Sequence, residues 1–168
     1  DLECRTVHFK VGRRHPIWRG NCVAIGLSGG FIEPLESTGI YLSDLGAVML
    51  ADLFPFEDKY VEALASRYNQ ILANRILEIL DFINLHYCIT RRTDTDFWRE
   101  VQKPERITDG LRAKLELWKI KPPSPSDSLV DRARLWNHQS HEFILYGMGF
   151  LEQECNERYG TDRPPLAA

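Results

Sequence analysis

The longest continuous pattern in this sequence is the amphipathic stretch from Tyr60 to Ile89. Its apolar residues recur every three or four positions, as they do on the buried face of an α-helix. These residues are Val61, Leu64, Tyr68, Ile71, Leu72, Ile76, Ile79, Leu80 and Ile83. The pattern therefore predicts one long helix that is buried along one side.

Strand signals occur only before residue 55. Residues 6–11 alternate polar and apolar, which predicts a half-buried strand, and the apolar run 22–25 predicts a buried one. A glycine-rich turn at 26–30 follows, and apolar residues then recur at helical spacing from Ile40 to Leu53. This part of the chain is predicted to be strand, glycine turn and helix.

Three further helical stretches follow residue 90. They run from Thr93 or Thr95 to Val101, over residues 111–118 and over residues 129–150. Pro104 separates the first two, and the proline-rich segment 121–126 separates the last two, because proline cannot continue a helix.

The predicted fold is therefore mainly α. Two strands alone are marginally stable, so we expect them to be the last strands of a larger sheet. Residues 1–55 are predicted to end one domain, and residues 56–168 to form a helical domain. The chain begins with Asp1 and its first methionine is Met49, so we expect a processed or cut protein.

Composition excludes several classes of protein. The 168 residues are 43% hydrophobic and 11% aromatic, which is typical of a globular chain. A net charge of -3 leaves no basic footprint for nucleic acid or an anionic membrane. No apolar run reaches the roughly 20 residues that span a bilayer, and the first residues do not resemble a signal peptide.

The four cysteines, Cys4, Cys22, Cys88 and Cys155, are far apart and form no CxxC pair. Cys22 and Cys88 lie in apolar stretches, so we expect buried thiols and a reducing, cytoplasmic setting. His138 and His141 are three residues apart, but no third ligand accompanies them, and no metal site is expected.

The candidate binding and catalytic residues lie mainly in residues 26–40. Ser37, Thr38 and Gly39 lie at a predicted helix start, where unpaired backbone N–H groups favour an anion. Glycines at 26, 29 and 30 would let a flat or phosphorylated cofactor approach the backbone. Glu33 and Glu36 could supply a general base, although the simpler interpretation is that they cap the helix.

The run from Gly20 to Ile40 closely resembles the flavin-dependent tryptophan halogenases. The segment Phe31-Ile32-Glu33-Pro34-Leu35-Glu36-Ser37-Thr38 is nearly diagnostic of that family. Leu85-His86-Tyr87 and Asp94-Thr95-Asp96-Phe97-Trp98 are also similar to its helical region. The resemblance covers most of the chain and is weakest after residue 120.

The resemblance implies a flavoprotein-monooxygenase-like, α/β FAD-binding domain, of which the two strands and first helix are a remnant, joined to a helical region. It implies that reduced FAD, supplied by a separate flavin reductase, reacts with oxygen and then chloride or bromide. The product is hypohalous acid, which halogenates an aromatic substrate.

The resemblance also implies roles for individual residues. Glu36 matches the catalytic glutamate, which polarises the oxidant and stabilises positive charge on the substrate ring. Thr38 and Gly39 match the halide contacts. Leu27 and Ile40 match positions that line the flavin, and Gly30 is the glycine expected to admit it.

The substrate side matches the family less closely. Leu135-Trp136 corresponds to a Phe-Trp pair that packs the indole, and Asp131 precedes it at the spacing of a substrate-binding acid. The chain has no Tyr-Tyr pair, so indole or another aromatic is as consistent with it as free tryptophan. A core role is an equal alternative for Trp136 and the favoured one for Trp98 and Trp118.

The family's GxGxxG, catalytic lysine and WxWxIP motifs do not occur in this sequence. We therefore expect the chain to correspond to the C-terminal third of such an enzyme and to be inactive without the remaining N-terminal FAD-binding portion. Two alternatives are a flavoprotein monooxygenase-like protein without halide chemistry, and a helical binding module on a flavin-domain remnant.

Overall fold

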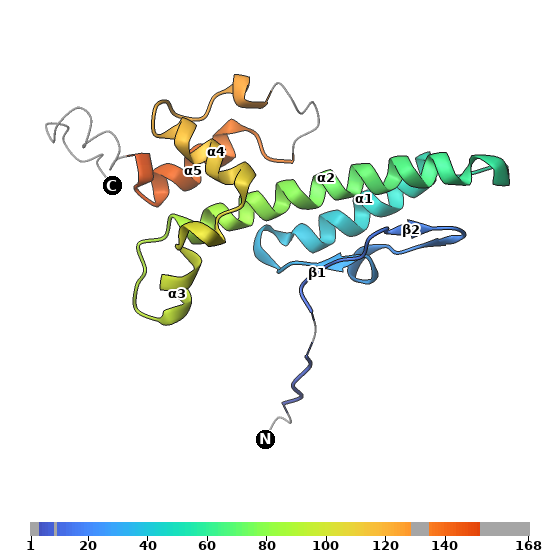
Figure 1. Ribbon diagram of the computed structural model, residues 1–168, viewed down its shortest axis with the longest axis horizontal. Helices are drawn as coiled ribbons and strands as arrows, with labels where there is room; N and C mark the ends of the chain where they lie inside the picture. The colour runs from blue at the N-terminus through green and yellow to red at the C-terminus, as the bar shows by residue number, and fades with distance from the viewer. Residues whose placement is uncertain (1–3, 9, 129–134, 152–168) are drawn as a thin grey trace, which may run out of the picture. The chain divides into compact units, whose positions relative to one another are not determined.

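The computed structural model describes residues 4–8, 10–128 and 135–151 (Figure 1). Its contacts divide the chain into two compact units, residues 1–77 and 78–168. The long helix α2, Val61–Cys88, contributes residues to both. Among the described residues the fold is mainly helical, as the sequence predicts, and no helix is long and apolar enough to cross a membrane.

The first unit combines two short antiparallel pairs with a helical hairpin. Its strands are β1 (Gly12–Arg13), β2 (Trp18–Arg19), β3 (Cys22–Val23) and β4 (Gly30–Phe31). Strand β1 pairs with β4, Gly12 opposite Phe31, and β2 pairs with β3, Trp18 opposite Val23. Its helical elements are the 3₁₀ turns η1 (Gly26–Ser28), η2 (Leu35–Ser37) and η3 (Asp58–Tyr60), helix α1 (Thr38–Asp52) and the first part of α2.

All regular elements among the described residues of the second unit are helices. After the end of α2 come α3 (Asp96–Val101), η4 (Pro104–Arg106), α4 (Asp109–Trp118), η5 (Pro125–Ser128) and α5 (His138–Gly147). The predicted helices at 40–53, 60–89 and 111–118 are thus confirmed, and Thr95 is the residue that precedes α3. Within the described part of the helix predicted at 129–150, α5 begins at His138, where Asn137 accepts a hydrogen bond from the Ser140 amide and caps it. Residues 129–134 lie outside the described part.

The strand predictions need correction. The described residues between 6 and 11 form no strand, and Val7 and Val11 are 65% and 62% exposed. Alternation alone does not make a strand, because a strand requires hydrogen bonds to a neighbour. The expected buried strand at 22–25 is reduced to the two residues of β3, which close a tight hairpin with β2.

The cysteine prediction is wrong for Cys22, which is exposed in that hairpin. Cys88 is half-buried near the end of α2, and this burial raises the pKa of its thiol to about 11. Cys155 lies outside the described residues.

The core of the second unit joins the end of α2 to α4 and α5. It consists of Leu85, Leu111, Leu115, Trp118, Leu145 and Leu151. Trp118 is 2% exposed, which confirms its predicted core position. The start of α4 is fixed by Thr108, whose hydroxyl accepts from the Leu111 amide and donates to Asp81 Oδ1 at 2.6 Å.

The core of the first unit lies between α2 and the β2–β3 hairpin. It contains Ile17, Trp18, Ala65, Tyr68, Leu72 and Ile76. The rings of Tyr68 and Trp18 are nearly perpendicular with centroids 5.5 Å apart, and the Tyr68 hydroxyl donates to the Gly46 carbonyl of α1 at 3.2 Å. A Cβ at Gly46 would lie 3.2 Å from that hydroxyl, so this glycine allows α1 to approach α2 closely.

Asn69 ties the hairpin to α2 with three hydrogen bonds. Its Oδ1 accepts from the amides of Ile17 and Trp18, both at 2.8 Å, and its Nδ2 donates to the Trp18 carbonyl at 2.9 Å. Ile17 and Trp18 are both buried, so these backbone groups have no ready access to water as a substitute partner.

We predict that Asn69→Ala lowers the free energy of unfolding by about 2–4 kcal/mol, because it removes three hydrogen bonds and leaves buried backbone groups unsatisfied. Urea denaturation followed by circular dichroism measures the change. Asn74→Ala, an exposed asparagine of the same helix, is the control and is expected to change the value by less than about 0.5 kcal/mol. Equal stabilities for the two variants would contradict this assignment.

Candidate functional site

The start of α1 is preceded by two consecutive residues in the left-handed conformation. The φ angle is 59° at Glu36 and 54° at Ser37, and the Ser37 amide donates to the Pro34 carbonyl at 3.0 Å. Neither residue is glycine, so each costs on the order of 1–3 kcal/mol, and strain of this kind concentrates at functional sites. The turn is followed directly by the first residue of α1, Thr38.

The hydroxyl of Thr38 belongs to this turn. Thr38 is 2% exposed, and its Oγ1 lies 3.4 Å from the Leu35 carbonyl oxygen and 3.5 Å from that of Glu33. A hydroxyl has one proton to donate, so it is occupied by these internal acceptors. Ser37, the N-cap residue, makes no side-chain capping bond. The start of α1 can therefore bind an anion through its backbone N–H groups and not through the Thr38 hydroxyl.

The space beside the helix start is open. A Cβ built on Gly39 meets no atom within 4 Å, and the next residue, Ile40, is 75% exposed. The Glu36 side chain is also exposed. The structure thus brings together four of the predicted site residues, Glu36, Thr38, Gly39 and Ile40, in one turn and the helix that it begins.

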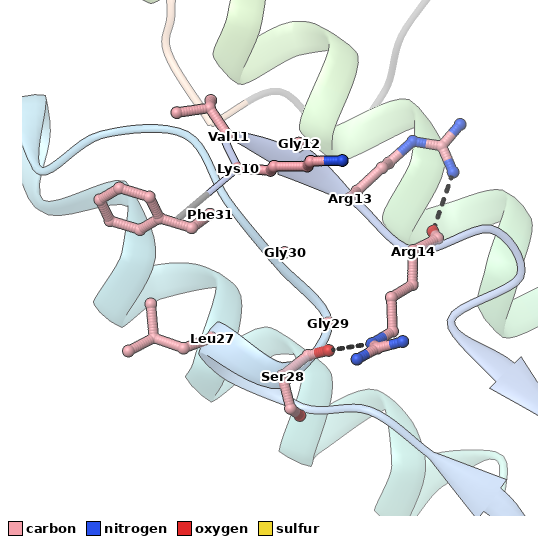
Figure 2. Close-up of a pocket in the computed structure, with 10 residues that line it drawn as sticks. All are labelled: Lys10, Val11, Gly12, Arg13, Arg14, Leu27, Ser28, Gly29, Gly30 and Phe31. Carbon is pink, nitrogen blue, oxygen red and sulfur yellow. Dashed lines mark hydrogen bonds between the residues drawn. The ribbon is translucent and has the colours of Figure 1, made fainter. Parts of the chain in front are cut away.

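A hollow of about 850 Å³ lies on the same unit (Figure 2). The pairing of β1 with β4 forms it, by bringing residues 10–14 against residues 27–31. The predicted flavin residues Leu27 and Gly30 both line it, and Leu27 is 75% exposed.

Three cationic side chains, Lys10, Arg13 and Arg14, line this hollow, and no acidic residue of the described part of the chain does. Arg14 Nε donates to the Ser28 carbonyl at 2.7 Å, as Figure 2 shows, so its guanidinium is held against the glycine-rich turn. No sequence pattern assigns these cations to the site, because the pairing that brings them to the turn joins separate segments of the chain.

Packing within the unit explains why glycine occurs at three positions of the turn. A Cβ on Gly30 would lie 2.9 Å from the Gly12 carbonyl oxygen across the β1–β4 pair. A Cβ on Gly26 would lie 2.7 Å from Ser43 Oγ, and one on Gly29 would lie 3.0 Å from the Ala24 carbonyl oxygen. Close packing inside the unit therefore suffices to require glycine at these positions.

In the second unit, Trp136 is partly exposed just before α5 and stacks on Phe82 of α2, with ring centroids 4.0 Å apart. Asp131, the other predicted substrate residue, lies outside the described residues.

Trp98, expected in the core, is instead half-buried. Its ring stacks with that of Tyr87, with centroids 5.9 Å apart, and the Arg92 guanidinium lies 4.4 Å from its ring centroid.

His141 is packed rather than free to bind a metal. It is 8% exposed, its ring lies 5.1 Å from both Phe82 and Trp118, and its Nδ1 is 2.9 Å from the Asn137 carbonyl oxygen. The described residues contain no group of three or more metal-ligating side chains.

A family model described as tryptophan halogenase matches residues 1–162 of the chain. The chain belongs to the tryptophan halogenase family. It is 38% identical over 151 residues to tryptophan 6-halogenase SttH of Streptomyces toxytricini, an alignment that covers 90% of this chain and 28% of SttH.

Solved structures of halogenases have the same fold. A tryptophan halogenase from Shewanella frigidimarina superposes with a TM-score of 0.80 at 32% identity, over 99% of this chain and 30% of that one. Xcc4156, a flavin-dependent halogenase from Xanthomonas campestris, superposes with a TM-score of 0.73 at 36% identity, over 86% of this chain and 28% of its own. The chain thus spans less than a third of these halogenases.

The strain at Ser37 can be tested in this halogenase-family chain without any ligand. We predict that Ser37→Gly raises the free energy of unfolding by about 1 kcal/mol, because glycine adopts a positive φ without steric cost. Ser37→Ala removes the same hydroxyl but keeps the Cβ, so it is the matched control and should give no gain. A gain in both variants, measured by chemical denaturation, would trace the effect to the hydroxyl instead.

Proposed function

We propose that this chain is the C-terminal part of an FADH2-dependent halogenase that transfers chlorine or bromine to tryptophan, indole or a related aromatic. The observation that carries the proposal is the strained turn at Glu36 and Ser37, which leads into an open helix start in a chain of this family.

The halide site in this proposal is formed by the backbone N–H groups of Thr38 and Gly39. Two features of the described residues support it. The Thr38 hydroxyl bonds back to the turn, and the space beside Gly39 is free of protein atoms. The positive end of the α1 dipole adds to the attraction for an anion.

The flavin in this proposal lies against Leu27 and Ile40. Each is 75% exposed, which is unusual for large apolar side chains and fits a surface that an aromatic cofactor covers. The cations of the hollow give the neighbouring surface the sign that a phosphorylated cofactor requires. When bound, reduced FAD, regenerated by a separate flavin reductase, would supply the activated oxygen that oxidises halide to hypohalous acid.

Glu36 is the proposed catalytic residue. Its carboxylate polarises the oxidant and stabilises the positive charge that develops on the aromatic ring during electrophilic attack. An exposed carboxylate at the end of a rigid, strained turn can be held toward a substrate without reorganisation when the reaction occurs.

On the substrate side we propose Trp136 as the wall against which the aromatic ring packs, with Asp131 and Glu36 as the polar contacts. SttH is named as a tryptophan halogenase, which makes tryptophan the first substrate to test. Indole remains a second candidate because the chain has no Tyr-Tyr pair. The chain alone is proposed to be inactive, since it contains no GxGxxG or WxWxIP motif.

We predict that Glu36→Gln, introduced into the full-length enzyme that contains this chain, lowers the halogenation rate at least about 100-fold while FAD binding is retained. Mass spectrometry of tryptophan and indole products, with flavin reductase and bromide present, measures the rate. Glu33→Gln removes the same charge from the same turn and is the control. Retained halogenation in Glu36→Gln would refute its role, and products independent of halide would favour the monooxygenase alternative.

We predict that Gly39→Ala raises the KM for halide at least about tenfold, because its methyl group fills the open space and displaces an anion whose hydrogen bond contributes about 1.5–3 kcal/mol. The same change should leave the fold as stable or more stable, since alanine favours a helix over glycine. Gly147→Ala also adds a methyl group into open space at the end of α5 and should change neither value. An unchanged halide KM in Gly39→Ala would place the halide elsewhere.

A further inference from the structure

We propose that Glu78 and Phe82, one turn apart on α2, are positioning residues that hold Trp136 as a fixed aromatic wall for the substrate. This inference rests on the proposed function, in which Trp136 packs the aromatic ring. It adds two residues that touch neither substrate nor flavin in that proposal and that act through Trp136.

Phe82 holds the ring of Trp136. The two rings are stacked with centroids 4.0 Å apart and planes 14° from parallel. Phe82 is 3% exposed, whereas Trp136 remains partly exposed, so one indole face is covered and the residue still borders solvent. A planar substrate could pack on the uncovered side of such a ring.

The Phe82 ring is itself confined by two histidines. The ring centroids of His86 and His141 lie 5.0 Å and 5.1 Å from its own, with planes close to perpendicular to it. Both histidines are fixed by backbone carbonyls, His86 Nδ1 at 2.8 Å from the Phe82 oxygen and His141 Nδ1 at 2.9 Å from the Asn137 oxygen. The surface behind Trp136 is therefore rigid.

Glu78 and Asn137 hold the backbone on the two sides of Trp136. Glu78 Oε1 accepts from the amide of Leu135 at 2.7 Å, a hydrogen bond that joins residues 57 positions apart. On the other side, Asn137 is the N-cap of α5 and accepts from the Ser140 amide at 3.0 Å. The backbone of Trp136 is thus held on both sides, and its ring is held by Phe82.

The consequence for the proposed function is a substrate surface that is preorganised. A wall that is already ordered costs no further side-chain entropy when a ring binds to it. Losing the anchor should weaken substrate binding while leaving halide and flavin binding unchanged, because both are proposed to involve other residues.

The first test follows Trp136 itself in this chain, labelled with 5-fluorotryptophan. Its ¹⁹F resonance is identified as the one that Trp136→Phe removes, and Trp18, in the other unit, reports on folding. We expect Glu78→Ala and Phe82→Leu to broaden the Trp136 resonance or shift it toward the position of free 5-fluorotryptophan. Glu78→Gln should resemble the wild type, because an amide oxygen accepts the same hydrogen bond.

The second test measures steady-state kinetics of the full-length, flavin-loaded enzyme with tryptophan and with indole. Glu78→Ala is expected to raise the substrate KM about two- to tenfold, the range that one aromatic contact contributes, with the halide KM unchanged. Glu62→Ala removes an exposed glutamate from the same helix and should change neither constant. Glu78→Gln should restore the wild-type substrate KM.

The outcomes separate this inference from the proposed function. A Trp136 resonance that is the same in the wild type, Glu78→Ala and Phe82→Leu overturns the positioning role, whatever the enzyme does. Normal halogenation with an unchanged substrate KM in Trp136→Phe also overturns the inference and the proposed substrate role of Trp136, while the proposed halogenase activity stands. Failure of the wild-type enzyme to halogenate either compound overturns the proposed function and removes the substrate role of Trp136 with it.

Discussion

The left-handed turn at Glu36 and Ser37 is the constraint around which the first unit is built. A turn that costs free energy at two consecutive residues persists only if its surroundings hold both ends. On one side, Asn69 fixes the β2–β3 hairpin to α2. On the other, Tyr68 bonds the Gly46 carbonyl and holds α1 against the same helix. Adjacent residues of α2 thus anchor the elements before and after the turn, and the Thr38 hydroxyl secures it locally.

The helices of this chain could be predicted from the sequence because helical periodicity is a local property. The spacing of apolar residues marked α2 to within one residue at each end, and proline marked the break between α3 and α4. The strands could not be predicted in the same way. Residues 6–11 alternate as a strand does, but the described residues of that segment do not pair, and the first ladder begins at Gly12–Arg13, because a ladder depends on a partner elsewhere in the chain.

The candidate site likewise has one part that could be predicted from the sequence and one part that could not. The helix start at Thr38 was predicted from the sequence and is confirmed, since caps and turns are encoded by neighbouring residues. The catalytic and binding roles came from resemblance and remain proposals. The cations beside the glycine turn, the three bonds of Asn69, and the Glu78–Leu135 contact each join residues at least fourteen positions apart. No local sequence pattern indicates such pairs, so these contacts can be identified only in the folded structure.

In the function that we propose, this turn and the helix it begins form a halide site from backbone groups. Its most direct test is anomalous scattering from bromide in crystals of the full-length, flavin-loaded enzyme. We expect an anomalous peak within hydrogen-bond distance of the backbone nitrogens of Thr38 and Gly39, which disappears in Gly39→Ala. A well-occupied bromide elsewhere in the flavin site, with none at this helix start, would contradict it.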